Sequence, residues 1–183
     1  MTAVPFPVFR PHPLFRGGHA QTLAGFCLLG RQYPYVATQH AVQLSDGDRL
    51  VLYDDCPRAW KPKHRAVLLL AGLTGYHGSS YLVRIAGKLN ERGVRTFRLD
   101  HRGTEAGAGL ARFPYHAWRS GDVLAALQHM VQLVPSARIG LVSFSLNGNT
   151  TLKLFGELPD RLPPQLDRAL TVNPPINLSA CIR

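Results

Sequence analysis

The pattern of hydrophobic and polar positions predicts strands that alternate with helices. Residues 40–54 alternate apolar and polar side chains on both sides of Ser45-Asp46-Gly47-Asp48, which is typical of an antiparallel β-hairpin. The run from Ala66 to Ala71 is continuously apolar and suits a strand buried on both faces of a parallel sheet. Three more strands are predicted at residues 94–99, 138–143 and 169–172.

Helical spacing fills the segments between these strands. Apolar residues recur every three or four positions from Leu82 to Leu89, where Ser79 and Ser80 can cap a helix and Gly93 can end it. Two further helices are predicted at residues 116–133 and 146–157. Strands and helices in this order, preceded by a hairpin, predict an α/β fold with a mostly parallel sheet.

The chain of 183 residues is long enough for one substantial core. Residues 1–36 are rich in Pro, Gly and aromatic side chains without a helical period, so we expect an extended N-terminal arm lying over a body. Residues 37–183 are then expected to form a single α/β domain.

Ser145 lies where a predicted strand runs directly into a predicted helix. Ligands of such sheets bind beyond the carboxyl ends of the strands, so this turn is a candidate site. A serine at a sharp strand-to-helix turn is typical of a hydrolase nucleophile, with the motif GxSxG. Here Ser143 and Asn147 stand in the two glycine positions. An ordinary helix start capped by Ser143 or Ser145 is the alternative interpretation.

A glycine-containing loop follows the strand that ends at Ala71. In hydrolases with a nucleophile at such a turn, this loop supplies one backbone N–H of the oxyanion hole, and the residue after the nucleophile supplies the other. The predicted donors are therefore the amides of Leu73 and Leu146. Gly72 lets the chain turn back toward Ser145.

Taken together, these segments resemble the YheT-like branch of the α/β-hydrolase superfamily, which is related to animal abhydrolase-domain lipases and plant embryogenesis-associated proteins. The resemblance is collinear from residue 18 to 181. The matching segments are Gly18 to Leu23, Asp46-Gly47-Asp48, Asp54-Asp55, Gly72 to Gly75, Ser79-Ser80-Tyr81, Arg102-Gly103, Tyr115-His116-Ala117, Ser120, Asp122, Phe144-Ser145-Leu146, Gly148-Asn149, Lys153 to Glu157 and Asn173-Pro174-Pro175.

The resemblance implies an α/β-hydrolase fold and hydrolysis of carboxylic esters, with Ser145 as the nucleophile. Two positions depart from the family pattern. Ala71 stands where the family has a histidine that helps hold the oxyanion loop, and Asn147 replaces a glycine of the elbow. We expect both to modify the geometry of the site rather than to remove a reacting group.

A triad acid and a triad histidine are expected after Ser145, because that is the chain order in this fold. The acids that follow are Glu157, Asp160 and Asp167, and all eight histidines precede the nucleophile. The triad acid and histidine are therefore expected to be absent from this chain. A fragment, a frameshifted product or a noncatalytic α/β-hydrolase-like binding module would each account for this.

Composition and charge add little to the predicted fold and function. The formal net charge of +10 could favour nucleic acid or a lipid surface, but no nucleic-acid-binding signature accompanies it, so no nucleic-acid partner is expected. No apolar stretch reaches the length of a membrane span, while peripheral membrane contact stays open. Three widely spaced cysteines and the absence of a signal peptide indicate a cytoplasmic protein. Neither a metal nor an organic cofactor is implied.

Overall fold

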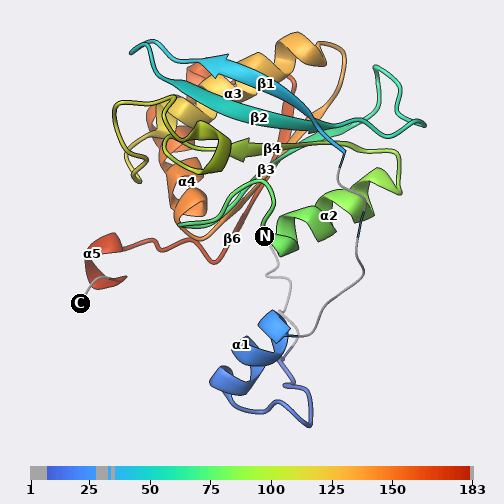
Figure 1. The fold of residues 1–183 in the computed structure, drawn as a ribbon, viewed down its shortest axis with the longest axis vertical. Helices are drawn as coiled ribbons and strands as arrows, with labels where there is room; N and C mark the ends of the chain where they lie inside the picture. The colour runs from blue at the N-terminus through green and yellow to red at the C-terminus, as the bar shows by residue number, and fades with distance from the viewer. Residues whose placement is uncertain (1–7, 28–32, 34–35, 182–183) are drawn as a thin grey trace, which may run out of the picture. The chain divides into compact units, whose positions relative to one another are not determined.

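The structure, a computed structural model, describes residues 8–27, 33 and 36–181 (Figure 1). The chain divides into two compact units, Met1–Gln32 and Tyr33–Arg183. In the part of the chain that is described, no helix combines the length and the apolar character needed to cross a membrane.

The first unit contains a helix where the sequence indicated extended chain. Helix α1 spans Gly18–Cys27, and the Thr22 hydroxyl donates to the Gly18 carbonyl at 3.0 Å within it. The prolines of this unit all precede Gly18, whereas Ala20 and Leu23 inside the helix favour helical backbone. The expectation of an extended arm was therefore wrong for these residues, while its boundary at residue 36 stays a prediction.

The second unit is built around a six-stranded mixed sheet in the order β1-β2-β4-β3-β5-β6 (Figure 1). Its antiparallel pairs are β1–β2 and β2–β4, and its parallel pairs are β4–β3, β3–β5 and β5–β6. The strands are β1 (Thr38–Gln43), β2 (Arg49–Asp55), β3 (Ala66–Leu70), β4 (Arg95–Asp100), β5 (Ile139–Phe144) and β6 (Leu166–Val172). The predicted α/β class with an N-terminal hairpin is confirmed.

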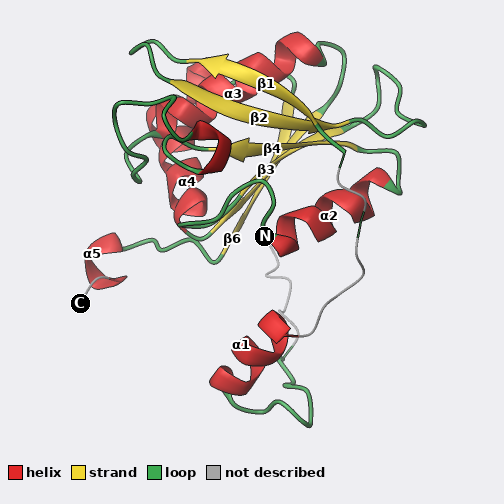
Figure 2. Cartoon of the chain, viewed as in Figure 1, coloured by secondary structure: helices red, strands yellow, loops and turns green. Residues whose placement is uncertain are grey.

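Helices cover both faces of this sheet (Figure 2). Helices α3 (Ser120–Leu133) and α4 (Leu146–Glu157) pack on one face, and α2 (Ser80–Asn90) packs on the other. Successive side chains of a strand point to opposite faces, so Leu68 and Leu70 of β3 contact the first layer and Leu69 contacts α2. This two-sided burial explains why β3 is apolar throughout.

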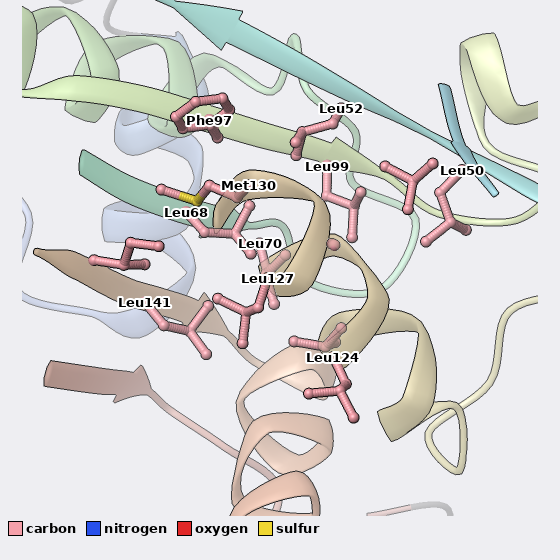
Figure 3. Close-up of a cluster of buried hydrophobic side chains, with 14 of the residues drawn as sticks. Leu50, Leu52, Leu68, Leu70, Phe97, Leu99, Leu124, Leu127, Met130 and Leu141 are labelled. Atoms are coloured by element: carbon pink, nitrogen blue, oxygen red, sulfur yellow. The ribbon is translucent and has the colours of Figure 1, made fainter. Parts of the chain in front are cut away.

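The larger core lies between the sheet and α3 (Figure 3). Phe97 and Leu99 of β4 are fully buried against this layer, together with Leu127 and Met130 of α3. Burying a side chain of this size contributes about 1.5–3 kcal/mol. The packing fixes the sheet, and with it the carboxyl ends of β3, β4 and β5.

Several predicted element ends differ from those observed. Helix α3 begins at Ser120, because residues 116–119 form a turn in which the Arg119 amide donates to the His116 carbonyl at 3.0 Å. Strand β6 begins at Leu166, three residues earlier than predicted. The prediction began only at Ala169 because Asp167 and Arg168 are polar, and both side chains lie on an exposed part of the strand. The short elements that the sequence did not predict are η1 (Glu105–Gly107), η2 (Pro159–Arg161) and α5 (Leu178–Cys181).

The predicted cap of α2 also differs from the one observed. Ser79 occupies the capping position without a side-chain bond to the helix, and its hydroxyl accepts from the Tyr76 amide at 3.0 Å. Ser79 therefore stabilises the turn before α2 rather than the first turn of the helix itself.

A buried arginine joins the hairpin turn to the helical layer. Arg102, 3% exposed, donates to both carboxylate oxygens of Asp122 on α3, at 2.7 and 2.8 Å. Its third nitrogen donates to Asp46 at 2.7 Å and to Asp48 at 2.5 Å. A buried charge is tolerated only when it is paired in this way. The network fixes the loop after β4, at the edge of the sheet that also carries Ser145.

Candidate active site

Ser145 forms the turn between β5 and α4, and its backbone angles are unusual. Its φ is +49° and its ψ is −120°, a combination that non-glycine residues rarely adopt and that costs on the order of 1–3 kcal/mol. The Ser145 amide donates to the Val172 carbonyl at 2.9 Å, which links the turn to β6. The residue is exposed, and its side chain makes no capping bond to α4. The alternative of an ordinary helix cap at Ser145 therefore finds no support.

Two glycines make room for this turn. A Cβ atom on Gly72 would lie 3.1 Å from the Ser145 Cβ, so the chain after β3 passes directly beside the serine. A Cβ atom on Gly148, in the first turn of α4, would lie 3.0 Å from the Pro174 Cβ. Both distances are tighter than ordinary van der Waals contact. The sharp turn is therefore possible because its neighbours lack side chains.

Asn147 has a structural role that the sequence did not reveal. Its side chain is fully buried, its Nδ2 donates to the Ala71 carbonyl at 2.5 Å, and its Oδ1 accepts from the Tyr115 hydroxyl at 2.9 Å. Asn147 lies within α4 and outside the left-handed region, so the position does not demand glycine. The side chain binds the end of β3 to the start of α4.

The two predicted oxyanion donors lie on either side of Ser145. Leu146 is the first residue of α4, where N–H groups have no acceptor within the helix and the helix dipole favours negative charge. Leu73 follows Gly72 in the loop after β3. Within the described residues, neither amide has a protein acceptor.

The loop that carries Leu73 is held by hydrogen bonds to its neighbours. The Gly72 amide donates to the Tyr81 hydroxyl at 2.9 Å, and the Gly75 amide donates to the Gly72 carbonyl at 3.0 Å. Thr74 sits between them at φ +62°. Sequence reasoning missed Tyr81 as an anchor; its position at the start of α2, directly after the loop, was the available signal.

His77 and His101, which follow β3 and β4 in the sequence, are engaged in contacts with residues other than Ser145. His77 contacts Asp100 through its ring Nδ1 at 2.7 Å and stacks on Tyr53 with ring centroids 3.6 Å apart. Its amide also donates to Asp100 at 2.7 Å, so His77 binds the loop after β3 to the end of β4. No hydrogen bond joins any histidine to Ser145 in the part of the chain that is described.

His101 is buried beneath the site rather than open to it. Only 2% of the residue is exposed, and its ring stacks on Tyr115 at 4.1 Å. Burial lowers the pKa of His101 to about 4, although the negative charge of Asp122 acts in the opposite direction. The ring is therefore neutral at pH 7 and packs as part of the core.

Two of the acids that follow Ser145 in the sequence, Glu157 and Asp167, are paired with basic side chains away from it. Glu157 ends α4, about 16 Å along the helix axis from its start, and binds Lys153 and Ser120. Asp167 lies at the start of β6, at the opposite end of the strands from Ser145, and accepts from Arg65 at 2.7 Å. Among residues 8–27, 33 and 36–181, no three His, Cys, Asp or Glu side chains are grouped to hold a metal ion.

Comparison with known proteins gives the same fold. No family model matches the chain. The sequence is 29% identical to Phospholipase ABHD3 of Mus musculus and 30% identical to that of Bos taurus, over 115 residues. Each alignment covers 63% of this chain and 28% of the relative, so the matched segment spans under a third of those proteins.

Two solved hydrolases superpose on most of the chain. The Pyrococcus furiosus esterase Pf2001 matches with a TM-score of 0.65 and 16% identity, over 83% of this chain and 58% of the esterase. XC6422 from Xanthomonas campestris, an α/β serine hydrolase without a lid, matches with a TM-score of 0.59 and 17% identity, over 81% of this chain and 66% of that protein. The chain has the fold of the α/β serine hydrolases.

Proposed function

We propose that this protein is a serine hydrolase of carboxylic esters, with Ser145 as its nucleophile. The observation that carries the proposal is the exposed Ser145 at φ +49° between β5 and α4. In the reaction, Ser145 Oγ bonds to the ester carbonyl carbon and gives its proton to a base. The alcohol then leaves with a proton, and water releases the acid from the acyl-enzyme.

The amides of Leu73 and Leu146 are the proposed oxyanion donors. Both belong to segments that contact or flank Ser145, and both are without a protein acceptor in the described part of the chain. Two preorganised N–H groups stabilise the negative oxygen of a tetrahedral intermediate. Asn147 and Tyr81 hold these segments in place.

Among the described residues, no side chain is hydrogen-bonded to Ser145 as a base. A serine hydroxyl is a weak nucleophile until a neighbouring base accepts its proton. We therefore propose that residues 1–183 alone hydrolyse esters negligibly, and that full activity requires a triad acid and histidine beyond them. The partial coverage of the phospholipase relatives supports this account.

A lipid ester is the proposed substrate class. The relatives named as phospholipases favour it, as does the resemblance to the YheT-like branch of the superfamily. Leu73, 63% exposed beside the site, offers an apolar contact for an acyl chain.

The cysteines bear on the compartment in which the protein acts. Cys27, Cys56 and Cys181 are free, which favours a reducing compartment such as the cytoplasm.

A fluorophosphonate probe tests the proposal. We expect very slow labelling of the chain, abolished by Ser145→Ala. Strong Ser145-dependent labelling would overturn the claim that residues 1–183 are inactive alone, while supporting Ser145 as the nucleophile. Labelling that persists in Ser145→Ala would refute the assignment of Ser145.

A noncatalytic binding module is the second candidate. It is favoured by the lack of any histidine bonded to Ser145 in the described residues, and by the departures at Ala71 and Asn147. The nucleotide sequence past codon 183 distinguishes the two. A continuation that encodes a late acid and histidine eliminates the binding module, and its absence favours it.

A further inference from the structure

Five basic side chains meet at the edge of the sheet where β3, β4 and β5 begin. They line a pocket of about 490 Å³ formed by Lys63, His64, Arg65, Arg92, Gly93, Val94 and Arg138. None of these lining residues is acidic. Ser145 follows the opposite end of β5, about 20 Å away at roughly 3.3 Å per residue, so this basic pocket is separate from the proposed active site.

The fold gathers these charges from segments that are far apart in the sequence. Arg65 and Arg138 precede β3 and β5, and the Ala66 amide donates to the Arg138 carbonyl at 3.0 Å. Arg92 lies between α2 and β4, where the Arg95 amide donates to the Arg65 carbonyl at 3.2 Å. The sheet's own ladder therefore places the three arginines on neighbouring chains.

The loop before β3 is held in a defined conformation. The Trp60 ring nitrogen donates to the Arg65 carbonyl at 3.0 Å, and the His64 amide donates to the Lys61 carbonyl at 2.8 Å. The Arg95 guanidinium lies 4.8 Å from the Trp60 ring centroid and fixes the indole from the sheet side. Lys63 and His64 are thus presented by an ordered turn.

The charges of the basic pocket exceed what its surroundings neutralise. Asp167 lies outside the lining residues; it pairs with Arg65 at 2.7 Å and also feels the positive charge of Arg138, so this one carboxylate offsets a single charge of the pocket. Arg92 follows the C-terminal end of α2, where the helix dipole favours a cation. Lys63 and Arg138 belong to no helix, so the dipole does not account for them.

We propose that the basic pocket binds a phosphate group that carries two or more negative charges. Guanidinium groups bind phosphate oxygens through paired, charge-assisted hydrogen bonds, and Lys adds a point charge. The pocket is shallow and open to solvent, because Lys63, Arg92 and Arg138 are exposed, so it suits a compact anion that is held mainly by charge. The site does not depend on the chemistry of Ser145.

Titration calorimetry with inorganic pyrophosphate tests this site, with ionic strength held constant by chloride. We expect saturable binding at one site per chain. Arg138→Gln and Arg92→Gln should each weaken it about tenfold, the effect of losing a hydrogen bond between charged groups. Both side chains are exposed, so neither substitution is expected to disturb folding.

Arg49→Gln is the matched control. Arg49 is also an exposed arginine, but it begins β2, which runs antiparallel to β4 and so starts at the opposite edge of the sheet. Its loss should leave pyrophosphate binding unchanged. The proposal fails if no saturable binding occurs at millimolar pyrophosphate, or if Arg49→Gln weakens binding as much as Arg138→Gln does.

A second arm identifies the source of the phosphate. Phosphatidylcholine vesicles, with and without a phosphatidylinositol phosphate, are sedimented with the full chain. Retention that requires the phosphorylated lipid, and that pyrophosphate and Arg138→Gln both abolish, assigns the pocket to a lipid headgroup. Pyrophosphate binding without vesicle retention assigns it to a soluble phosphate compound. Retention unaffected by Arg138→Gln would contradict the assignment of this pocket to the lipid.

Discussion

Asn147 and Tyr115 hold the turn at Ser145 against the end of β3. Replacing Asn147 by Ala leaves the Ala71 carbonyl without its partner, and the Tyr115 hydroxyl keeps only its longer contact of 3.4 Å with Thr150 Oγ1. An unsatisfied buried polar group costs about 1–3 kcal/mol, so with the loss of the second bond Asn147→Ala should lower the free energy of unfolding by roughly 2–4 kcal/mol. Urea unfolding followed by circular dichroism measures this change.

The matched control lies two residues further along α4. Asn149 makes one side-chain bond, to the Pro175 carbonyl at 2.9 Å, and is only partly buried. Asn149→Ala should therefore cost about 1 kcal/mol. A smaller loss for Asn147→Ala than for Asn149→Ala would show that Asn147 does not brace the turn.

His101 predicts a dependence of stability on pH. Its pKa is lowered to about 4 by burial, against 6.5 for an unperturbed histidine. Between these values the unfolded chain binds a proton that the folded chain excludes. Neutral His101 therefore makes its full contribution to the free energy of unfolding above about pH 6.5. As the pH falls below this value, the free energy of unfolding decreases by up to about 1.4 kcal/mol per pH unit.

His101→Phe should flatten this dependence, because phenylalanine retains the stacking on Tyr115 but takes up no proton. Urea unfolding at pH 7.5, 6 and 5 gives the slopes. The exposed His19 provides the control, because His19→Gln removes an imidazole that lies outside the buried core. Equal slopes for the parent chain and His101→Phe would contradict the burial of a neutral imidazole.

At the scale of elements, the junction of β5 and α4 stores backbone strain. Glycine reaches φ +49° without a Cβ penalty, whereas alanine retains the penalty of serine. Ser145→Gly should therefore be about 1 kcal/mol more stable than Ser145→Ala in urea unfolding. Ser143 lies in regular strand two residues earlier, so Ser143→Gly should destabilise the chain relative to Ser143→Ala. Ser145→Gly no more stable than Ser145→Ala would argue against a strained turn.

The order of strands and helices could be predicted from the sequence because burial repeats with a short period. The two-sided burial of β3 and the direct run of β5 into α4 are local patterns. The contacts of Asn147 could not be predicted, since its partners Ala71 and Tyr115 lie 76 and 32 residues away. Helix α1 was missed because the proline-rich residues before it obscured a helix-forming segment.

At the scale of the whole molecule, the two ends of the sheet carry different chemistry. The carboxyl ends of β3 and β5 present Ser145 and the amides of Leu73 and Leu146, whereas the opposite edge gathers arginines. Part of the net charge of +10 is therefore concentrated at this one end of the sheet. The sequence did not indicate this cluster of positive charge, because its basic residues are dispersed along the chain. The two ends of the sheet can differ in this way because parallel strands run in the same direction, so their amino ends lie together and their carboxyl ends lie together.

We propose that Ser145 is the nucleophile and that the described residues provide no base for it. Imidazole in solution can act as a base, so it should restore part of the missing function. Intact-mass measurement of fluorophosphonate addition, with and without imidazole at constant pH, tests this directly.

We predict slow addition that accelerates in proportion to imidazole, maps to Ser145 and disappears in Ser145→Ala. Rapid addition without imidazole would show that the chain already contains a base for Ser145. Addition at another residue, or addition that survives in Ser145→Ala, would contradict the assignment of Ser145 as the nucleophile.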